Sequence, residues 1–352
     1  MTILDNPLDQ DEYSSQFDAN YGRKSGDVHY PQNDVIMCAG SQGVTIMKKI
    51  VTALVALLTG AVAHAHESRS LAEVLDGFGT DFDNVVVRVE TLKPGLHAIF
   101  AAGGTVVVSI GDQGVLMVDD QFPEVLPKLK QAINDLGGGD IDFVINTHWH
   151  FDHANNNPQL GAEGTWFVAH TNSRRKMTGT STILYDGYSY DQPPYPVEGL
   201  PVISFDKTMQ LHFNEQKIEL AYFGPAHTAG DAVVFFRGDN VAHLGDLYSS
   251  GYPYIDAANG GTLAGLIVVC RSIADSINKD TILVSGHSGI ASYADLLAYI
   301  AMLETIHHRM ETLIDSGHSL EDILKAAPSA DFDAERGDAT LFLTMAYLSF
   351  AH

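Results

Sequence analysis

The stretch NTHWHFDH, residues 146–153, decides how the rest of the sequence is interpreted. It directly follows a short apolar segment that predicts a buried strand, and it offers four potential metal ligands within six residues. Because alternate residues of an extended backbone point the same way, we expect His148, His150 and Asp152 to converge. His153 then points elsewhere, toward a second ion. Imidazole and carboxylate groups are the ligands that zinc uses in catalytic sites, which leave a position open for water.

Three further fragments carry residues of the same ligand types, and each follows an apolar segment that predicts a strand. They are AHTAGD at residues 226–231, LGD at residues 244–246 and SGHSG at residues 285–289. A single histidine after a strand is usually a structural residue. Several such fragments in one chain instead indicate a metal centre, because loops that follow the strands of a sheet can meet at its edge.

These fragments, together with residues 114–119 as a strand that ends in an acidic residue, resemble the metallo-β-lactamase superfamily over roughly residues 85–303. The resemblance implies an α/β fold, a four-layer αβ/βα sandwich with the metals at one edge of the sheets. It also implies two zinc ions (Zn²⁺) per chain. Carried over position by position, it gives one set of ligands for the first ion, one for the second and a bridging residue: His148, His150 and His227; Asp152, His153 and His287; and Asp246.

Departures from the family pattern bear on the substrate. Lactamases with a zinc-binding cysteine in the fourth motif and an arginine after the aspartate of the first are not matched, because this chain has Asp246 and His153 there. The Asp152–His153 pair resembles the other dizinc branch of the lactamases. A bridging Asp246 is more typical of glyoxalase II-like, lactonase-like and sulfatase-like hydrolases. The resemblance alone therefore leaves two substrate classes open.

Residues 47–65, MKKIVTALVALLTGAVAHA, have the pattern of a secretory signal. Two lysines precede a short apolar run, and AHA at the end offers the small residues that a signal peptidase reads. The run is too short to span a bilayer, which needs about 20 apolar residues. Because a signal begins at its own initiator, we interpret residues 1–46 as a disordered over-extension upstream of the true start. The alternative is a real disordered arm.

The mature protein is then expected to comprise residues 66–352, a single metallo-β-lactamase-like domain with a C-terminal helical extension, in the bacterial periplasm or outside the cell. The whole chain has 44 acidic and 20 basic residues, a formal net charge of −24. Such a field repels phosphate backbones and anionic lipid surfaces. We therefore expect a small-molecule substrate, no nucleic-acid partner, and no membrane association after signal cleavage.

The mature chain alternates between strand and helix patterns. Strands are predicted at residues 85–89, 96–100, 105–110, 115–118, 141–146, 165–169, 208–211, 218–222, 233–236, 241–244 and 281–284. Helices are predicted at residues 123–136, 173–177, 261–277, 293–316 and 320–326. Residues 185–201 hold four prolines and four tyrosines and predict a long loop without helix or strand. Its aromatic residues and the turn at residues 100–104 are expected at the rim of the metal site.

The mechanism that the resemblance implies is hydrolysis by a dinuclear zinc centre, with a metal-bound hydroxide attacking a carbonyl. Two divalent ions about 3.5–4 Å apart can share a hydroxide and stabilise both the attacking and the leaving atom. Asp152 is the expected catalytic residue, because it is best placed to orient the water and move its proton. Among the other histidines, we expect His243 to lie next to a ligand, and the rest to take no part.

Three functions compete, and a non-catalytic zinc-binding protein is a fourth alternative. A β-lactam or similar cyclic amide is slightly favoured, on the export signal and the Asp152–His153 pair. A lactone, ester or thioester is favoured by Asp246. The third function belongs to a different class of enzyme, a mononuclear iron oxygenase of the persulfide-dioxygenase type. That enzyme needs only three ligands and a cytosolic thiol, so the larger ligand set and the signal argue against it.

Overall fold

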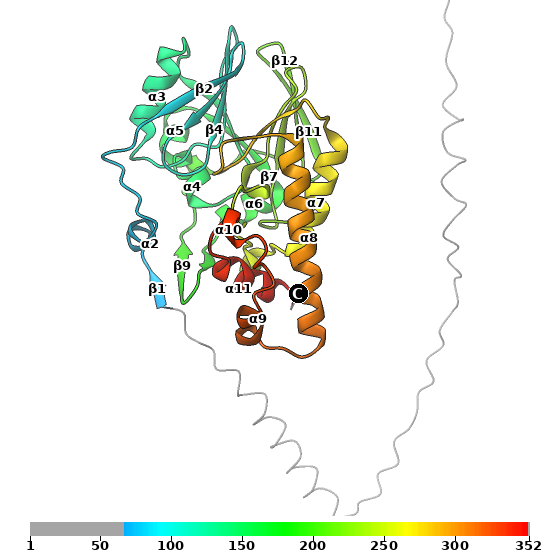
Figure 1. The fold of residues 1–352 in the computed structure, drawn as a ribbon. Coiled ribbons are helices and arrows are strands. Elements are labelled where there is room, and N and C mark those ends of the chain that lie inside the picture. The colour runs from blue at the N-terminus through cyan, green and yellow to red at the C-terminus, as the bar shows by residue number, and fades with distance from the viewer. Residues whose placement is uncertain (1–66, 351–352) are drawn as a thin grey trace, which may run out of the picture. The chain divides into compact units, whose positions relative to one another are not determined.

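Two sheets of apolar strands form the centre of the structure, a computed structural model that describes residues 67–350 (Figure 1). The described residues all fall in one structural unit. The predicted signal, residues 47–65, and the upstream residues 1–46 lie outside them, so the proposed domain boundaries stay a prediction. Within residues 67–350, no helix has the length and apolar character that crossing a membrane requires.

The first sheet has seven strands in the order β10-β7-β6-β5-β4-β3-β2. Neighbours from β2 to β5 are antiparallel, whereas β5, β6, β7 and β10 are parallel. Their bounds are β2 Arg88–Lys93, β3 Leu96–Phe100, β4 Val106–Gly111, β5 Gly114–Val118, β6 Ile141–Asn146, β7 Trp166–His170 and β10 Ile203–Phe205.

The second sheet has six strands in the order β11-β12-β13-β14-β15-β16. All its neighbours are antiparallel except β14 and β15, which are parallel. Their bounds are β11 Thr208–Phe213, β12 Gln216–Ala221, β13 Val233–Phe236, β14 Val241–His243, β15 Ile282–Val284 and β16 Ile290–Ala291.

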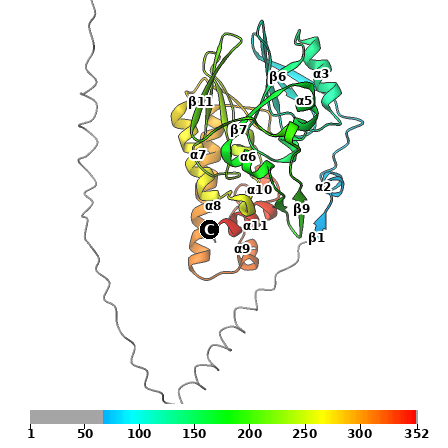
Figure 2. The same cartoon turned by 180° about the vertical axis from the view of Figure 1, so that it is seen from behind.

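The central strands are apolar on both faces because each face packs against another layer. In β13, Val234 and Phe236 lie in the core between the sheets, and Val233 and Phe235 lie in the core under the helices. The covering helices are α3 (Leu126–Asp135) and α5 (Asn157–Glu163) on the first sheet, and α7 (Leu263–Ser276) and α8 (Tyr293–Asp315) on the second. Figures 1 and 2 show these pairs on opposite sides of the sheets. The predicted four-layer αβ/βα sandwich is confirmed.

A third, small sheet lies beside the sandwich, in the order β1-β9-β8. Its strands are β1 (Glu67–Arg69), β8 (Ser181–Leu184) and β9 (Tyr188–Gln192), and α2 (Leu71–Gly77) follows β1. The predicted loop at residues 185–201 is therefore wrong for β9. The strand forms because β9 pairs with β8 and, in parallel, with β1 from the far N-terminal end, a partner that local sequence patterns do not reveal.

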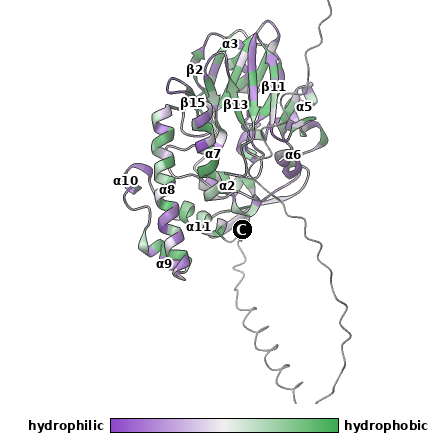
Figure 3. Cartoon of the chain, turned by 90° about the vertical axis from the view of Figure 1, so that its right-hand side faces the viewer, coloured by the Kyte–Doolittle hydropathy of each residue, from purple (hydrophilic) through white to green (hydrophobic). Residues whose placement is uncertain are grey.

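Three helices complete the described chain: α9 (Leu320–Ala326), α10 (Asp333–Arg336) and α11 (Thr340–Ser349). Phe342, Leu343, Met345 and Ala346 of α11 join the core under the second sheet. Helix α8, which links this region to the sandwich, carries both hydrophobic and hydrophilic residues along its length (Figure 3). The C-terminal helices therefore share a core with the sandwich.

Candidate metal centre

The seven predicted ligands come from loops and short helices that follow strands of both sheets. His148 and His150 follow β6, and helix α4 (Phe151–Ala154) supplies Asp152 and His153. His227 lies in the loop between β12 and β13. The 3₁₀ helix η2 (Gly245–Leu247), directly after β14, and the loop after β15 supply the remaining two, Asp246 and His287. The structure brings all seven residues together.

The first cluster consists of His148, His150 and His227, all buried. The Nε2 atom of His148 and the Nε2 atom of His227 lie 3.1 Å and 3.0 Å from Nδ1 of His150. Burial, together with the neighbouring rings, holds the pKa of His148 well below its usual value, so its ring is neutral. Three ring nitrogens facing one point, with a neutral ring among them, fit a bound divalent cation.

The second cluster consists of Asp152, His153 and His287. The Nε2 atoms of the two histidines lie 3.1 Å apart, and Oδ2 of Asp152 lies 3.0 Å from Nε2 of His287. The expectation that Asp152 converges with His148 and His150 is wrong, because α4 begins at Phe151 and the backbone there is no longer extended. Asp152 lies instead where the resemblance assigns it, beside His153.

Asp246 lies between the two clusters. Its Oδ2 atom is 3.7 Å from Nε2 of His227 and 3.4 Å from Nε2 of His287, and its Oδ1 atom is 3.3 Å from Nε2 of His153. The Oδ1 atom is buried without a hydrogen bond. A buried carboxylate oxygen that lacks a partner is costly unless a cation binds it. A Cβ atom at Gly286 would lie 2.0 Å from this oxygen, so the glycine makes room for the carboxylate.

The second cluster attracts positive charge. Burial would lower the pKa of His287, but the carboxylates of Asp246 and Asp152 raise it to about 10. Burial would likewise raise the pKa of Asp152, yet His153 and His287 lower it to about 2. The partly buried carboxylates of Asp152 and Asp246 therefore remain charged and favour any cation at this position, whether a proton on a ring or a metal ion.

Other side chains fix the ligand rings. Asp119, directly after β5, accepts a hydrogen bond from Nδ1 of His153 at 2.7 Å. Asp256 accepts one from Nε2 of His150 at 2.9 Å, and the backbone oxygen of Tyr254 accepts one from Nδ1 of His227 at 2.8 Å. In each case the other ring nitrogen faces the cluster, as in metal sites whose ligands are oriented by outer partners. The sequence analysis did not single out Asp256 or Tyr254, since both stand in a stretch without a recognisable pattern.

Of the remaining histidines, His243 was expected to lie next to a ligand. Nε2 of His243 donates to the backbone oxygen of Thr105 at 2.8 Å, and its Nδ1 accepts from the backbone of Gly245, directly before Asp246. It therefore supports the Asp246 loop.

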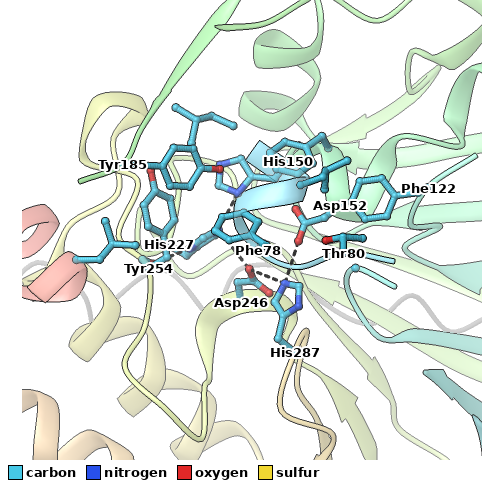
Figure 4. A pocket seen from close by; sticks show the side chains of 15 residues that line it. Phe78, Thr80, Phe122, His150, Asp152, Tyr185, His227, Asp246, Tyr254 and His287 are labelled. Atoms are coloured by element: carbon cyan, nitrogen blue, oxygen red, sulfur yellow. Dashed lines mark hydrogen bonds and ion pairs between the residues drawn. The ribbon is translucent and has the colours of Figure 1, made fainter. Parts of the chain in front are cut away.

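A cavity of about 390 Å³ opens over both clusters (Figure 4). Five ligands reach it: His150, Asp152, His227, Asp246 and His287. Aromatic and aliphatic side chains make up most of the remaining wall, and among them are Phe78, Phe122, Phe151, Tyr185 and Tyr254. Gly103 of the predicted turn and Tyr185 of the predicted loop border the cavity, as expected, whereas Tyr188, Tyr190 and Tyr195 of that loop do not line it. The arrangement can hold two cations beside a mostly apolar space that admits an organic substrate.

Comparison with known families agrees with this geometry. The family model of the metallo-beta-lactamase superfamily matches residues 102–268, a segment that contains every predicted ligand except His287. No curated protein gives a significant match to the chain.

Numerous solved structures are similar to this chain, two metallo-beta-lactamases among them. One is a metallo-beta-lactamase from Pontibacter korlensis, with 14% identity and a TM-score of 0.50, and the other is the DIM-1 metallo-beta-lactamase, with 17% identity and a TM-score of 0.51. The matches cover 62% and 63% of this chain and 99% of each of those chains. At such low identity the two structures show only the fold of this chain. The match to the family model and the ligand clusters identify the superfamily. The chain therefore belongs to the metallo-β-lactamase superfamily, and it is a metal-dependent hydrolase of that superfamily.

Proposed function

We propose that this hydrolase works with two zinc ions and cleaves a carbonyl compound. The observation that carries the proposal is the position of Asp246, whose two oxygens lie within 3.7 Å of ring nitrogens from both clusters. A single ion would need only one of these clusters. Nitrogen-rich clusters that combine imidazole with carboxylate suit zinc better than magnesium or calcium, which prefer oxygen ligands.

When bound, such a pair of ions lowers the pKa of a water molecule and polarises the substrate carbonyl. The protein contributes position and proton handling. Asp152 lines the cavity and keeps a fifth of its side chain accessible, so its carboxylate can orient a water and accept the proton that the water loses. The same carboxylate can then return the proton to the leaving oxygen or nitrogen.

The substrate classes open at this level are a β-lactam or similar cyclic amide, and a lactone, ester or thioester. Each places a carbonyl at the metal centre and releases a nitrogen, oxygen or sulfur atom. All are small molecules, consistent with a cavity of about 390 Å³.

Metal content and a substrate panel test the proposal. Mass spectrometry of the purified protein is expected to find about two zinc ions per chain, and a chelator is expected to abolish hydrolysis of at least one member of a panel of lactams, lactones, esters and thioesters. About one metal per chain with iron dominant, together with oxygen consumption in the presence of a thiol persulfide, would contradict it. That result would favour the mononuclear oxygenase.

We also propose that the protein is exported and cleaved after Ala65, on the signal pattern at residues 47–65. Expression of the gene in a bacterium from Met47, followed by fractionation and N-terminal sequencing, is expected to give a periplasmic or secreted chain that begins at His66. Cytoplasmic protein that retains the segment would refute this proposal.

A further inference from the structure

Part of the wall of the cavity over the metal centre comes from segments outside the part of the chain that matches the family. Leu75 in α2, together with Phe78 and Thr80 just after it, lines one side. Leu341 of α11 lines another. These residues precede or follow the family-matched segment, residues 102–268. Six of the seven predicted ligands lie in the matched segment, whereas these four lining residues lie outside it.

Phe78 is the most informative residue of this wall. Its side chain is apolar yet 56% exposed, and it stands at the cavity in front of the metal ligands (Figure 4). Its ring packs edge-on against Tyr185, with centroids 5.7 Å apart. Covering an exposed aromatic ring with an apolar partner is favourable, because it removes apolar surface from water. A substrate in the cavity would be such a partner.

The aromatic surface continues from Phe78 to the ligands. Tyr185 stacks on Tyr254 at 5.9 Å, and Tyr254 lies 5.8 Å from the ring of His227. A substrate whose carbonyl lies at the metal centre can therefore extend an apolar group along Tyr254 and Tyr185 to Phe78. The N-terminal segment that carries Phe78 is held in place, because β1 pairs with β9 and Arg69 stacks over the ring of Tyr188.

Charge narrows the substrate class further. Among the described residues that line the cavity, none is lysine or arginine. A substrate carboxylate remote from the metal centre would therefore lose its hydration without gaining a charged partner, which is unfavourable. The formal net charge of the whole chain, −24, also repels anions from the surface.

We propose that the substrate is an uncharged ester or lactone with an apolar acyl chain, and that Phe78, Tyr185 and Tyr254 bind this chain. The inference rests on the proposed hydrolytic function and narrows its substrate class. It places β-lactams that carry a free carboxylate among the poor substrates.

A matched set of esters tests the inference: para-nitrophenyl acetate, para-nitrophenyl hexanoate and mono-para-nitrophenyl adipate, whose acyl chain ends in a carboxylate. With the zinc-loaded protein, kcat/KM for the hexanoate is expected to exceed that for each of the other two by at least about tenfold, because its apolar chain leaves water. Equal or faster hydrolysis of the adipate, or of carboxylate-bearing β-lactams, would overturn the inference.

Variants test whether Phe78, Tyr185 and Tyr254 cause the preference for the longer apolar acyl chain. In Phe78→Ala, the ratio of kcat/KM for hexanoate to that for acetate is expected to fall at least about fivefold, with partial recovery in Phe78→Leu. Trp166→Ala is the matched control, since Trp166 is 55% exposed and lies away from the cavity. It is expected to keep the ratio of the unaltered protein. An unchanged ratio in Phe78→Ala would refute the role of this wall.

A binding measurement separates this inference from the hydrolytic function. Hexyl phenyl ether and methyl phenyl ether cannot be hydrolysed, and calorimetry gives their Kd for the zinc-loaded protein. The hexyl ether is expected to bind at least about tenfold more tightly, and Phe78→Ala is expected to reduce that difference. If no ester is hydrolysed but the hexyl ether binds more tightly and Phe78→Ala reduces the difference, the proposed function is wrong. The role of Phe78 in binding an apolar chain is then still supported. Equal Kd values would refute the wall independently of any activity.

Discussion

Asp119 illustrates how one residue organises the metal centre. Its backbone has a φ of 58°, in the left-handed region that aspartate tolerates better than most residues. Oδ1 accepts from the backbone N–H of Thr147, and Oδ2 accepts from the hydroxyl of Thr147 and from Nδ1 of His153. Because His153 donates through Nδ1, the lone pair of its Nε2 atom remains available to the second cluster.

Replacement of Asp119 by asparagine therefore has a specific expected effect. Asparagine keeps the size and the left-handed backbone, but its amide nitrogen cannot accept a hydrogen bond from either His153 or Thr147. We expect zinc affinity at the second site to fall about 10–100-fold. Titration against a chromophoric chelator measures it, with Asp112→Asn in an exposed turn as the control. If both zinc sites of Asp119→Asn keep their affinities, Asp119 does not orient His153 for metal binding.

Replacement of Asp152 by asparagine tests proton handling. The variant keeps one oxygen ligand but loses the charge that holds the proton. Hydrolysis is expected to fall at least about 10²-fold, even with zinc in excess. Zinc content is measured beside the rate, because a metal-depleted variant would be slow for a different reason. Retained turnover in a fully metallated variant would mean that Asp152 only holds the metal.

At this scale the sequence predicts the ligands better than their surroundings. Histidines and aspartates just after predicted strands are conspicuous, so the sequence names all seven candidate ligands, and the structure brings them together. Asp256 lies 106 residues from His150, which it orients, and nothing local marks that relation. Phe78 is equally ordinary as a sequence feature, because its role depends on Tyr185 and on the cavity.

Among the elements, predictions succeeded where hydrophobic patterns are local. The predicted strands at residues 96–100, 141–146 and 233–236 coincide with β3, β6 and β13, because apolar residues predominate in each of them. The strand predicted at residues 85–89 instead begins at Arg88 and runs to Lys93 as β2. The turn at Gly95, whose φ is 72°, sets the end of that strand, and the valine-rich pattern alone did not reveal it.

The strand β13 is buried on both faces, which predicts a large effect on stability. Phe236 is fully buried between the sheets, and Phe236→Ala is expected to lower the free energy of unfolding by about 3–5 kcal/mol. Val268→Ala on α7, where the side chain is 59% exposed, is expected to change it by less than about 0.5 kcal/mol. Urea unfolding of both variants measures the difference. Similar losses in the two would show that the sheets do not form one core.

Over the whole molecule, the metal centre joins the two sheets. Its ligands follow β6 on one sheet and β14 and β15 on the other, and the backbone N–H of Thr105 donates to the oxygen of Gly286 across the same edge. The resemblance predicted this sandwich, since the superfamily motifs fix which strands end at the centre. It did not predict β1, α2 or the outer wall, which lie mostly beyond those motifs.

Removal of the metals is therefore expected to destabilise the entire fold. An ion that binds only the folded state stabilises it by about 4 kcal/mol when its free concentration is a thousand times its Kd. We expect a chelator to lower the unfolding temperature and added zinc to restore it. Magnesium, which prefers oxygen ligands, should restore little. An unfolding temperature that does not respond to chelation would argue against metal in this centre.

The long sequence separations within the centre also determine when it can form during folding. His148 and His150 are two residues apart, but His227 lies 77 residues from His150, and His287 lies 134 residues from His153. Closing such long loops costs entropy before any contact repays it, so both clusters must assemble late. An early chain can offer only the HWHFDH segment to an ion. High-affinity zinc uptake during refolding would then mark the moment at which the second sheet docks on the first.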